Sequence, residues 1–175
     1  KMKFKGQPWY RGDSMNLGIG QGYLSVTPLQ MVKLYGRIAS RGKPVYPHFL
    51  SSTSNDETFF TICKPKEYEV ETETVSSNHY DTILKGLHEA TIYPGTASGL
   101  NNNVVSIAAK TGTAMAESNM ATIQHLWIIS VFPSDNPEMV ALIMFENSNF
   151  DFAGDLAPFL KKFILYYYKL ESEVN

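Results

Sequence analysis

The chain has 175 residues, of which 43% are hydrophobic, and its 15 basic and 17 acidic side chains give a formal net charge of −2. This length suffices for one domain with a substantial core, and the charge gives no electrostatic reason to expect a nucleic-acid partner. The lone Cys63 excludes an internal disulfide, and the four histidines are scattered, so we expect neither a metal site nor a cofactor. No apolar run reaches the roughly 18 residues that a membrane span needs. We therefore expect any membrane anchor or export signal to lie outside this chain.

Residues 1–16 are rich in polar, aromatic and turn-forming types, which predicts an irregular lead-in. Leu17–Gly22 (LGIGQG) follows, and its three alternating glycines favour tight turns with positive φ. The spacing differs from that of the dinucleotide-binding fingerprint, so a phosphate-binding loop is the weaker interpretation of this segment.

A helix is predicted to begin at Thr27-Pro28-Leu29-Gln30. Thr27 can cap it, Pro28 suits the first helical position, and Gln30 completes a capping box. Gly42 and Pro44 should end this helix at about Arg41. Its apolar stripe is expected to comprise Leu29, Val32, Tyr35 or Gly36, and Ala39.

The middle of the chain contains an extended segment, a strand and a second helix. Pro44–Asn55 suits an extended segment, and strict alternation in Glu67–Val75 predicts a strand with four glutamates on one face. We interpret those glutamates as a solvated edge rather than as acid–base catalysts. Asn78 is predicted to cap a helix that Pro94-Gly95 stops, and Thr96–Asn103 is predicted to be a polar loop. The helix's predicted apolar stripe is Tyr80, Ile83, Leu84, Leu87 and Thr91.

Three strands and a last helix are predicted in the remainder. The β-branched and small residues of Val104–Ala109 predict a mostly buried strand that ends in Lys110-Thr111-Gly112-Thr113-Ala114, with a polar loop over Met115–Gln124. Short connections favour an antiparallel meander. The fold class is therefore α/β of the α+β type, an antiparallel sheet with helices packed on it. The other expected elements are strands at Leu126–Phe132 and Met139–Phe145 and a helix at Asp155–Leu170 with the stripe Leu156, Phe159, Leu160, Phe163, Ile164 and Tyr167.

The residue types of Lys110–Thr113 suit an anion. Lysine supplies charge, the threonine hydroxyls donate hydrogen bonds, and Gly112 lets a ligand lie close to the backbone. Taken alone, the short K-T-G sequence also fits an ordinary polar turn at a strand end. The companion motifs decide between these alternatives.

Several motifs occur in an order that resembles the penicillin-binding proteins, most closely the class B, elongation-type D,D-transpeptidases. The similarity extends from about residue 9 to residue 168. It implies part of the penicillin-binding and β-lactamase-like transpeptidase fold. The motifs are Gly18–Gly22 (GIGQG), Thr27–Gln30 (TPLQ), Gly95–Ala97 (GTA), Lys110–Ala114 (KTGTA), His125–Trp127 (HLW) and Ala157-Pro158.

The resemblance implies a mechanism and a set of partners. A serine of an S-x-x-K motif would attack the D-alanyl-D-alanine end of a peptidoglycan stem peptide, and an amine of a second stem peptide would resolve the acyl-enzyme. Lys110 would supply positive charge and help to organise the site, Thr111 and Thr113 would hold the substrate carboxylate, Gly112 would leave room for substrate, and the Thr113 N–H would form half of the oxyanion hole. The implied partners are stem peptides, β-lactams, the upstream part of the same protein and a membrane glycosyltransferase, at the extracytoplasmic face of the bacterial membrane.

The chain departs from the family pattern in one respect. The family places S-x-x-K and S-x-N upstream of GIGQG, whereas the chain's one S-x-x-K, Ser40–Lys43, follows it and contains a glycine. S-x-N occurs at Ser14, Ser76 and Ser134, none in the family's position. We therefore expect residues 1–175 to be the carboxyl-terminal portion of one transpeptidase domain, inactive without its nucleophile. The alternatives are a non-catalytic scaffold of the wall-synthesis machinery and, less well matched, a serine β-lactamase or sensor domain.

Overall fold

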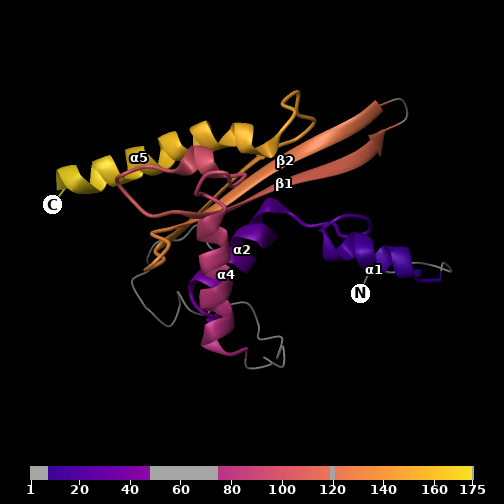
Figure 1. The fold of residues 1–175 in the computed structure, drawn as a ribbon, viewed down its shortest axis with the longest axis horizontal. Coiled ribbons are helices and arrows are strands. Elements are labelled where there is room, and N and C mark those ends of the chain that lie inside the picture. Colours follow the sequence, from indigo (N-terminus) through magenta and orange to yellow (C-terminus); the bar gives the residue numbers. More distant parts are fainter. Residues whose placement is uncertain (1–7, 48–74, 119–120, 175) are drawn as a thin grey trace, which may run out of the picture.

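The computed structural model describes residues 8–47, 75–118 and 121–174 (Figure 1). Helices and a three-stranded sheet make up these ranges. The elements are α1 (Arg11–Gly18), α2 (Pro28–Ala39), α4 (Ser77–Glu89), the 3₁₀ helix η1 (Ser98–Leu100), β1 (Ala108–Ser118), β2 (Ala121–Phe132), β3 (Met139–Phe145), the 3₁₀ helix η2 (Ala153–Leu156) and α5 (Ala157–Val174). Of the described helices, none combines the length and the apolar character that crossing a membrane requires.

The sheet is an antiparallel meander in the order β1-β2-β3, which confirms the predicted topology. The third strand has the predicted bounds, Met139–Phe145. The predicted polar loop Met115–Gln124 is wrong, because β1 and β2 continue as a paired ribbon from Ala114 opposite His125 to Ser118 opposite Ala121. The third strand pairs with β2 only from Leu126 onward. The part of the hairpin beyond Leu126 therefore has only two strands, and its residues need not alternate between apolar and polar types.

The first strand begins later than predicted, at Ala108 rather than at Val104. The side-chain oxygen of Asn102 accepts hydrogen bonds from the backbone N–H groups of Val104 (2.8 Å) and Val105 (3.0 Å). Such an asparagine turn competes with strand pairing, so the two β-branched residues that suggested a strand lie in a bend.

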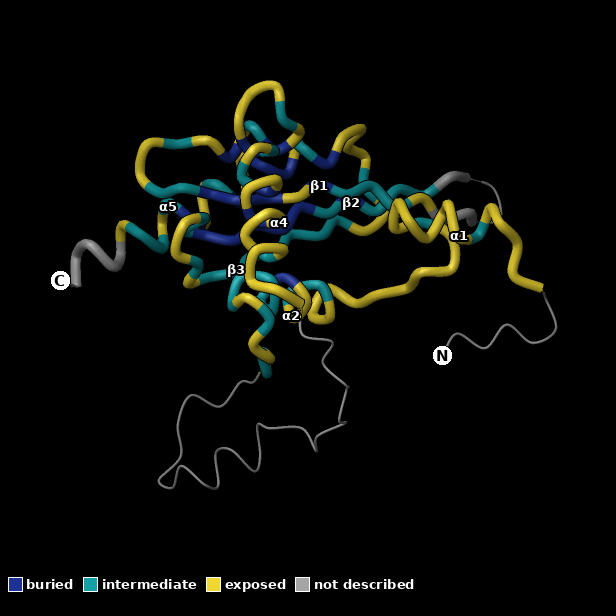
Figure 2. Tube along the Cα trace, turned by 60° about the horizontal axis from the view of Figure 1, so that its bottom comes forward, coloured by how far each residue is buried: buried dark blue, intermediate teal, exposed yellow. Residues whose placement is uncertain are grey.

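Each face of the sheet carries its own core. Residues 107 and 109 pack with Leu126, Ile128 and Phe132 against η1, η2 and α5, whereas Ala108 packs with Ile129 and Val131 against α2 and α4. In Figure 1, α5 lies on one side of the strands and α2 and α4 lie on the other. Figure 2 shows that segments of the strands are buried. The period-two alternation of a strand thus assigns odd positions near the start of β1 to the α5 side and even positions to the α2–α4 side.

The start of α2 confirms the predicted capping box. The Gln30 N–H donates to the Thr27 hydroxyl (3.2 Å), and the Thr27 N–H donates to the Gln30 side-chain oxygen (2.8 Å). The predicted stripe is wrong at Leu29, which is 59% exposed. It is confirmed at Tyr35 and Ala39, which pack in the core together with Met31 and Ile38.

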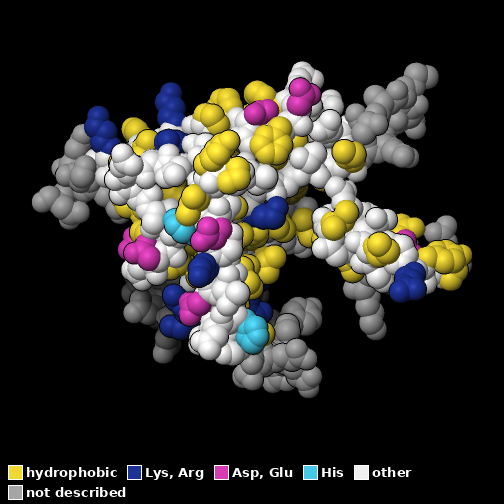
Figure 3. Space-filling view, viewed as in Figure 1, with side chains coloured by type: hydrophobic (Ala, Val, Ile, Leu, Met, Phe, Trp, Pro, Cys, Tyr) yellow, Lys and Arg dark blue, Asp and Glu magenta, His cyan; other side chains and the backbone are white. Residues whose placement is uncertain are grey.

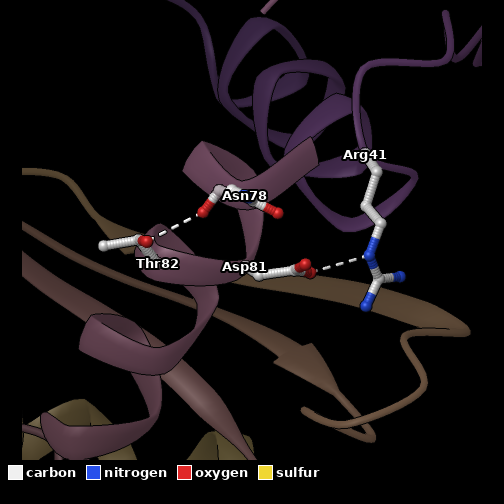
Figure 4. Close-up of polar contacts among 4 residues, drawn as sticks. All are labelled: Arg41, Asn78, Asp81 and Thr82. Carbon is white, nitrogen blue, oxygen red and sulfur yellow. Dashed lines mark hydrogen bonds and ion pairs between the residues drawn. The ribbon is translucent and has the colours of Figure 1, made fainter. Parts of the chain in front are cut away.

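The second and last helices differ from prediction at their ends. Ser76, not Asn78, precedes the first residue of α4, and the Asn78 carbonyl accepts a hydrogen bond from the Thr82 hydroxyl (2.8 Å; Figure 4). In α4, Leu84, Leu87 and the following Thr91 are buried as predicted, while Ile83 is 43% exposed. Leu156, Leu160 and Ile164 of the last stripe are buried, while Phe159 and Phe163 are half-exposed.

The predicted irregular lead-in is wrong because residues 11–18 form α1. No residue of α1 is buried, so the helix carries no apolar periodicity that could have predicted it. Local polar contacts hold it instead: the Tyr10 N–H donates to the Asp13 carboxylate (2.8 Å) and the Trp9 indole N–H donates to the Ser14 hydroxyl (2.8 Å). We call residues 8–26 the N-terminal arm; it projects beside the hairpin ribbon (Figure 1). The predicted strand at Glu67–Val75 lies, but for Val75, outside the described residues.

Candidate active site

The Lys110–Thr113 segment lies within β1, not at the strand end that we predicted. β1 pairs with β2 on one side and is an edge strand of the described sheet. Alternation places Lys110 and Gly112 on the α2–α4 face and Thr111 and Thr113 on the α5 face. The segment therefore has two differently equipped faces and one outer edge.

Lys110 is the exposed cation of this strand. Its Nζ donates a hydrogen bond to the carbonyl of the adjacent Thr111 (2.7 Å), so the ammonium group folds back over its own backbone. Ala108 and Ala109, which precede it, are fully buried, so Lys110 is the first residue of β1 whose side chain is exposed to solvent.

Thr111 is buried on the α5 face of the sheet, and only 7% of its surface is exposed. Its hydroxyl lies 2.9 Å from the hydroxyl of Thr96, which comes from the loop between α4 and η1. This contact joins the GTA segment to the KTGTA segment, which the sequence analysis related only by their order along the chain. Thr96 had no predicted role, and its place within the GTA motif was the only sequence signal.

A tight turn at Gly95 delivers Thr96 to the strand. The Gly95 N–H donates to the Ile92 carbonyl (2.6 Å) and the Ala97 N–H donates to the Ala90 carbonyl (2.9 Å). A Cβ atom at Gly95 would lie 2.2 Å from the Ala90 carbonyl oxygen, which is closer than any tolerated contact. Glycine is therefore required at this position by the chain's own packing.

Gly112 differs from Gly95. A Cβ atom at Gly112 would find only the Trp127 Cβ within 4 Å in the described part of the chain, at 3.7 Å, which is an ordinary contact. The chain's own packing therefore does not demand glycine there. A side chain at this position would instead occupy space beside Lys110 on the same face.

Thr113 receives a contact that our sequence interpretation missed. The Gln21 side-chain amide donates to the Thr113 carbonyl (2.8 Å). In an antiparallel strand the N–H and C=O of one residue point to the same side, so the Thr113 N–H faces the same outer edge. Gln21 lies within the GIGQG motif, which was the one available signal.

The structure confirms that Ser40 and Lys43 do not share a helical turn. Ser40 follows the last residue of α2, and the next two residues, Arg41 and Gly42, have positive φ values of 54° and 94°. The Ser40 hydroxyl donates to the Lys43 carbonyl (2.7 Å), and Arg41 forms an ion pair with Asp81 of α4 (2.8 Å; Figure 4). These contacts close a surface turn.

A second polar cluster lies where the chain enters β1. The Ser106 hydroxyl donates to the Asp135 carboxylate (2.6 Å), and the His88 Nδ1 lies 2.9 Å from the Ile107 carbonyl and 3.4 Å from the Ser134 hydroxyl. The hydrogen bond from Ser106 lowers the pKa of Asp135 below its ordinary value, with backbone hydrogen bonds adding to the effect. Among the described residues, no three His, Cys, Asp or Glu side chains are grouped so as to hold a metal ion.

Comparison with known proteins gives one consistent result. The family described as "Penicillin binding protein transpeptidase domain" matches residues 2–164. Among curated proteins, the peptidoglycan D,D-transpeptidase MrdA of Escherichia coli K12 is 30% identical over 159 residues, which cover 83% of this chain and 25% of the relative. MrdA of Acinetobacter baumannii is 28% identical over 190 residues, which cover all of this chain and 27% of the relative. The chain thus spans about a quarter of the length of these relatives.

Solved structures agree. The penicillin-binding protein PBP2 of Helicobacter pylori matches with a TM-score of 0.74 and 26% identity over 95% of this chain and 29% of that chain. A structure of the same protein in complex with MreC matches with a TM-score of 0.73 and 26% identity, covering 94% of this chain and 28% of that chain. Penicillin-binding protein 2B of Streptococcus pneumoniae matches in fold, with a TM-score of 0.66 at 20% identity over 93% of this chain and 28% of that chain. The chain belongs to the penicillin-binding protein transpeptidase domain family.

Proposed function

We propose that the protein containing this chain is a serine-type peptidoglycan D,D-transpeptidase and that the chain forms the carboxyl-terminal portion of its transpeptidase domain. The observation that carries the proposal is the outer edge of β1. It presents the exposed Lys110 ammonium, the glycine at position 112, where a Cβ atom would make only an ordinary contact, and the backbone of Thr113 within four consecutive residues. Positive charge and backbone N–H groups at one edge suit a substrate with a carboxylate and a carbonyl to be attacked.

The proposed reaction uses a serine hydroxyl from outside this chain. Its oxygen bonds to the carbonyl carbon of the penultimate D-alanine, and the hydroxyl proton passes to the nitrogen of the terminal D-alanine. That D-alanine then leaves as the amide bond breaks, and an ester remains. An amine of a second stem peptide then bonds to the same carbonyl carbon, the ester bond breaks, and a proton of the amine returns to the serine oxygen. The Thr113 N–H stabilises the oxyanion of each tetrahedral intermediate, and one such donor is worth about 3–4 kcal/mol. A β-lactam would acylate the same serine.

Lys110, Thr111 and Thr113 attract the terminal carboxylate of the substrate in this proposal. A hydroxyl has one donor and two acceptor positions, so the contact between Thr111 and Thr96 leaves Thr111 further hydrogen-bonding capacity. Stem peptides are the proposed substrate, and the extracytoplasmic face of the bacterial membrane is the proposed location. A membrane glycosyltransferase is the proposed partner protein.

Covalent labelling by a fluorescent penicillin tests the proposal. In the protein that contains this chain, Lys110→Ala should slow acylation by roughly 100-fold, since it removes a charge from the reacting edge. Lys162→Ala, which removes an exposed lysine of α5, is the matched control and should leave the rate unchanged. Absence of labelling in the parent protein would favour the scaffold alternative. The chain by itself should not be labelled, and a label on Ser40 would contradict the proposal.

The exposed surface of the N-terminal arm is consistent with a chain that forms only part of its domain. Its apolar side chains are open to solvent (Figure 3), including Trp9 (49% exposed), Met15 (72%) and Ile19 (75%). We propose that the nucleophile-bearing part of the same protein covers this surface. The chain alone should then self-associate, because large exposed apolar patches favour association. Light scattering that finds a clean monomer would count against this expectation.

A further inference from the structure

We infer that Gln21 is a positioning residue, which holds the outer edge of β1 by its hydrogen bond to the Thr113 carbonyl. The inference rests on the proposed transpeptidase function and assigns a role to the GIGQG segment, which that function leaves without one. Gln21 need not touch the reacting atoms. It acts through Thr113, whose N–H is the proposed oxyanion donor.

The contact is specific. Gln21 Nε2 lies 2.8 Å from the Thr113 carbonyl oxygen, and the two residues are 92 positions apart in the chain. Gln21 is half-buried, whereas every other residue from 14 to 30 is exposed. General packing of the arm therefore does not explain the contact, because the neighbours of Gln21 remain in solvent.

The backbone of the N-terminal arm constrains the position of Gln21. Gly20 and Gly22 flank Gln21 with φ values of 75° and 74°, a region that glycine adopts without steric cost. The Gln21 N–H donates to the Asn16 carbonyl (2.9 Å), and a Cβ atom at Gly22 would lie 3.1 Å from the Asn16 Cβ. The backbone around Gln21 is thus folded back on the end of α1, so little freedom remains at its Cα.

The consequence for the site follows from strand geometry. The N–H and C=O of Thr113 point to the same outer edge, and Gln21 fixes the peptide plane that carries the C=O. Fixing this plane limits rotation about Thr113 and so fixes where its N–H points. Oxyanion donors work by preorganisation, and a misplacement of about 1 Å can cost roughly 100-fold in rate.

Gln21→Glu gives the sharpest test, because the carboxylate keeps the shape of the amide and cannot donate to the carbonyl. The assay is single-turnover acylation of the complete protein by a fluorescent penicillin, which separates the dissociation constant from the acylation rate constant. We expect the rate constant to fall roughly 10- to 100-fold, with a smaller change in the dissociation constant and an unchanged thermal midpoint. Gln21→Ala should show the same loss. Gln124→Glu, which places the same charge on the adjacent ribbon, should retain the parent rate.

The outcomes separate this inference from the proposed function. If the parent is labelled and Lys110→Ala is impaired while Gln21→Glu reacts at the parent rate, the positioning role is overturned and the proposed function stands. If Gln21→Glu lowers the thermal midpoint and weakens binding as much as it slows acylation, Gln21 is merely structural and the inference is again overturned. If the parent itself is not labelled, both fail.

Discussion

The turn at Gly95 offers a decisive comparison between two glycine substitutions. Gly95→Ala would place a Cβ atom 2.2 Å from the Ala90 carbonyl oxygen and 2.7 Å from the Ile92 carbonyl oxygen. Both neighbours are backbone atoms in hydrogen-bonded turns, so neither can move aside by changing a rotamer. Gly86→Ala lies in the interior of α4, nine residues earlier, where a Cβ atom meets nothing within 4 Å among the described residues.

The expected magnitudes have opposite signs. Overpacking typically costs about 1–3 kcal/mol and more when the backbone must shift, so Gly95→Ala should lower the free energy of unfolding by about 3 kcal/mol. Gly86→Ala should raise it by about 0.5–1 kcal/mol, because alanine has less conformational freedom to lose in a helix. The two variants should therefore differ by roughly 3.5–4 kcal/mol in free energy of unfolding, although each adds the same methyl group.

Urea unfolding of the complete transpeptidase domain measures this difference, and acylation by a fluorescent penicillin measures its effect on the site. Because Gly95 delivers Thr96 to Thr111, Gly95→Ala should also slow acylation under conditions in which the domain remains folded. Equal stabilities of the two variants would refute the packing argument. A destabilised Gly95→Ala variant that acylates at the parent rate would show that this turn supports the fold but not the site.

Three other substitutions test separate features. Thr27→Ala should cost about 1 kcal/mol of unfolding free energy by removing the cap of α2, whereas Thr27→Ser should cost little. Ser106→Ala should raise the pKa of Asp135 toward its ordinary value, and an NMR titration that finds an unchanged pKa would contradict the assignment. Because the pKa is lowered in the folded state, the stability linked to this carboxylate is present at neutral pH and is lost below about pH 4. Leu126→Ala, at a fully buried position, should cost about 2–5 kcal/mol in urea unfolding, and the half-exposed Phe163→Ala should cost less.

The parts of the fold that follow from neighbouring residues could be predicted. The capping box at Thr27 and Gln30 depends on residues three apart, and the strand at Met139–Phe145 lies between clear turn signals. The meander follows from short connections between three apolar segments. In each case the information lies within a few positions of the element that it determines.

The errors occurred where contacts from elsewhere, or polar contacts without apolar periodicity, decide the structure. The helix α1 buries nothing, so no hydrophobic pattern marks it. Val104 and Val105 have strand-forming side chains, yet their backbone N–H groups donate hydrogen bonds to the Asn102 side chain and not to a neighbouring strand. The hairpin ribbon extends past the sheet without β3 cover, so its strands carry polar residues that suggested a loop.

The site divides in the same way. Its residue types at Lys110–Thr113 could be predicted to suit an anion, because charge, hydroxyls and glycine act through local chemistry. Alternation also fixes that Lys110 and Gly112 share one face. That the outer side of β1 is an edge depends on which strands pair, and that Gln21 meets Thr113 depends on a contact across 92 positions. The residues of Lys110–Thr113 therefore determine the chemistry of this site but not the contacts at its outer edge. The remaining information lies in the segment that contacts this edge. Substitutions at Gln21 and at Lys110 should therefore both slow acylation, the first by releasing the Thr113 carbonyl and the second by removing a positive charge.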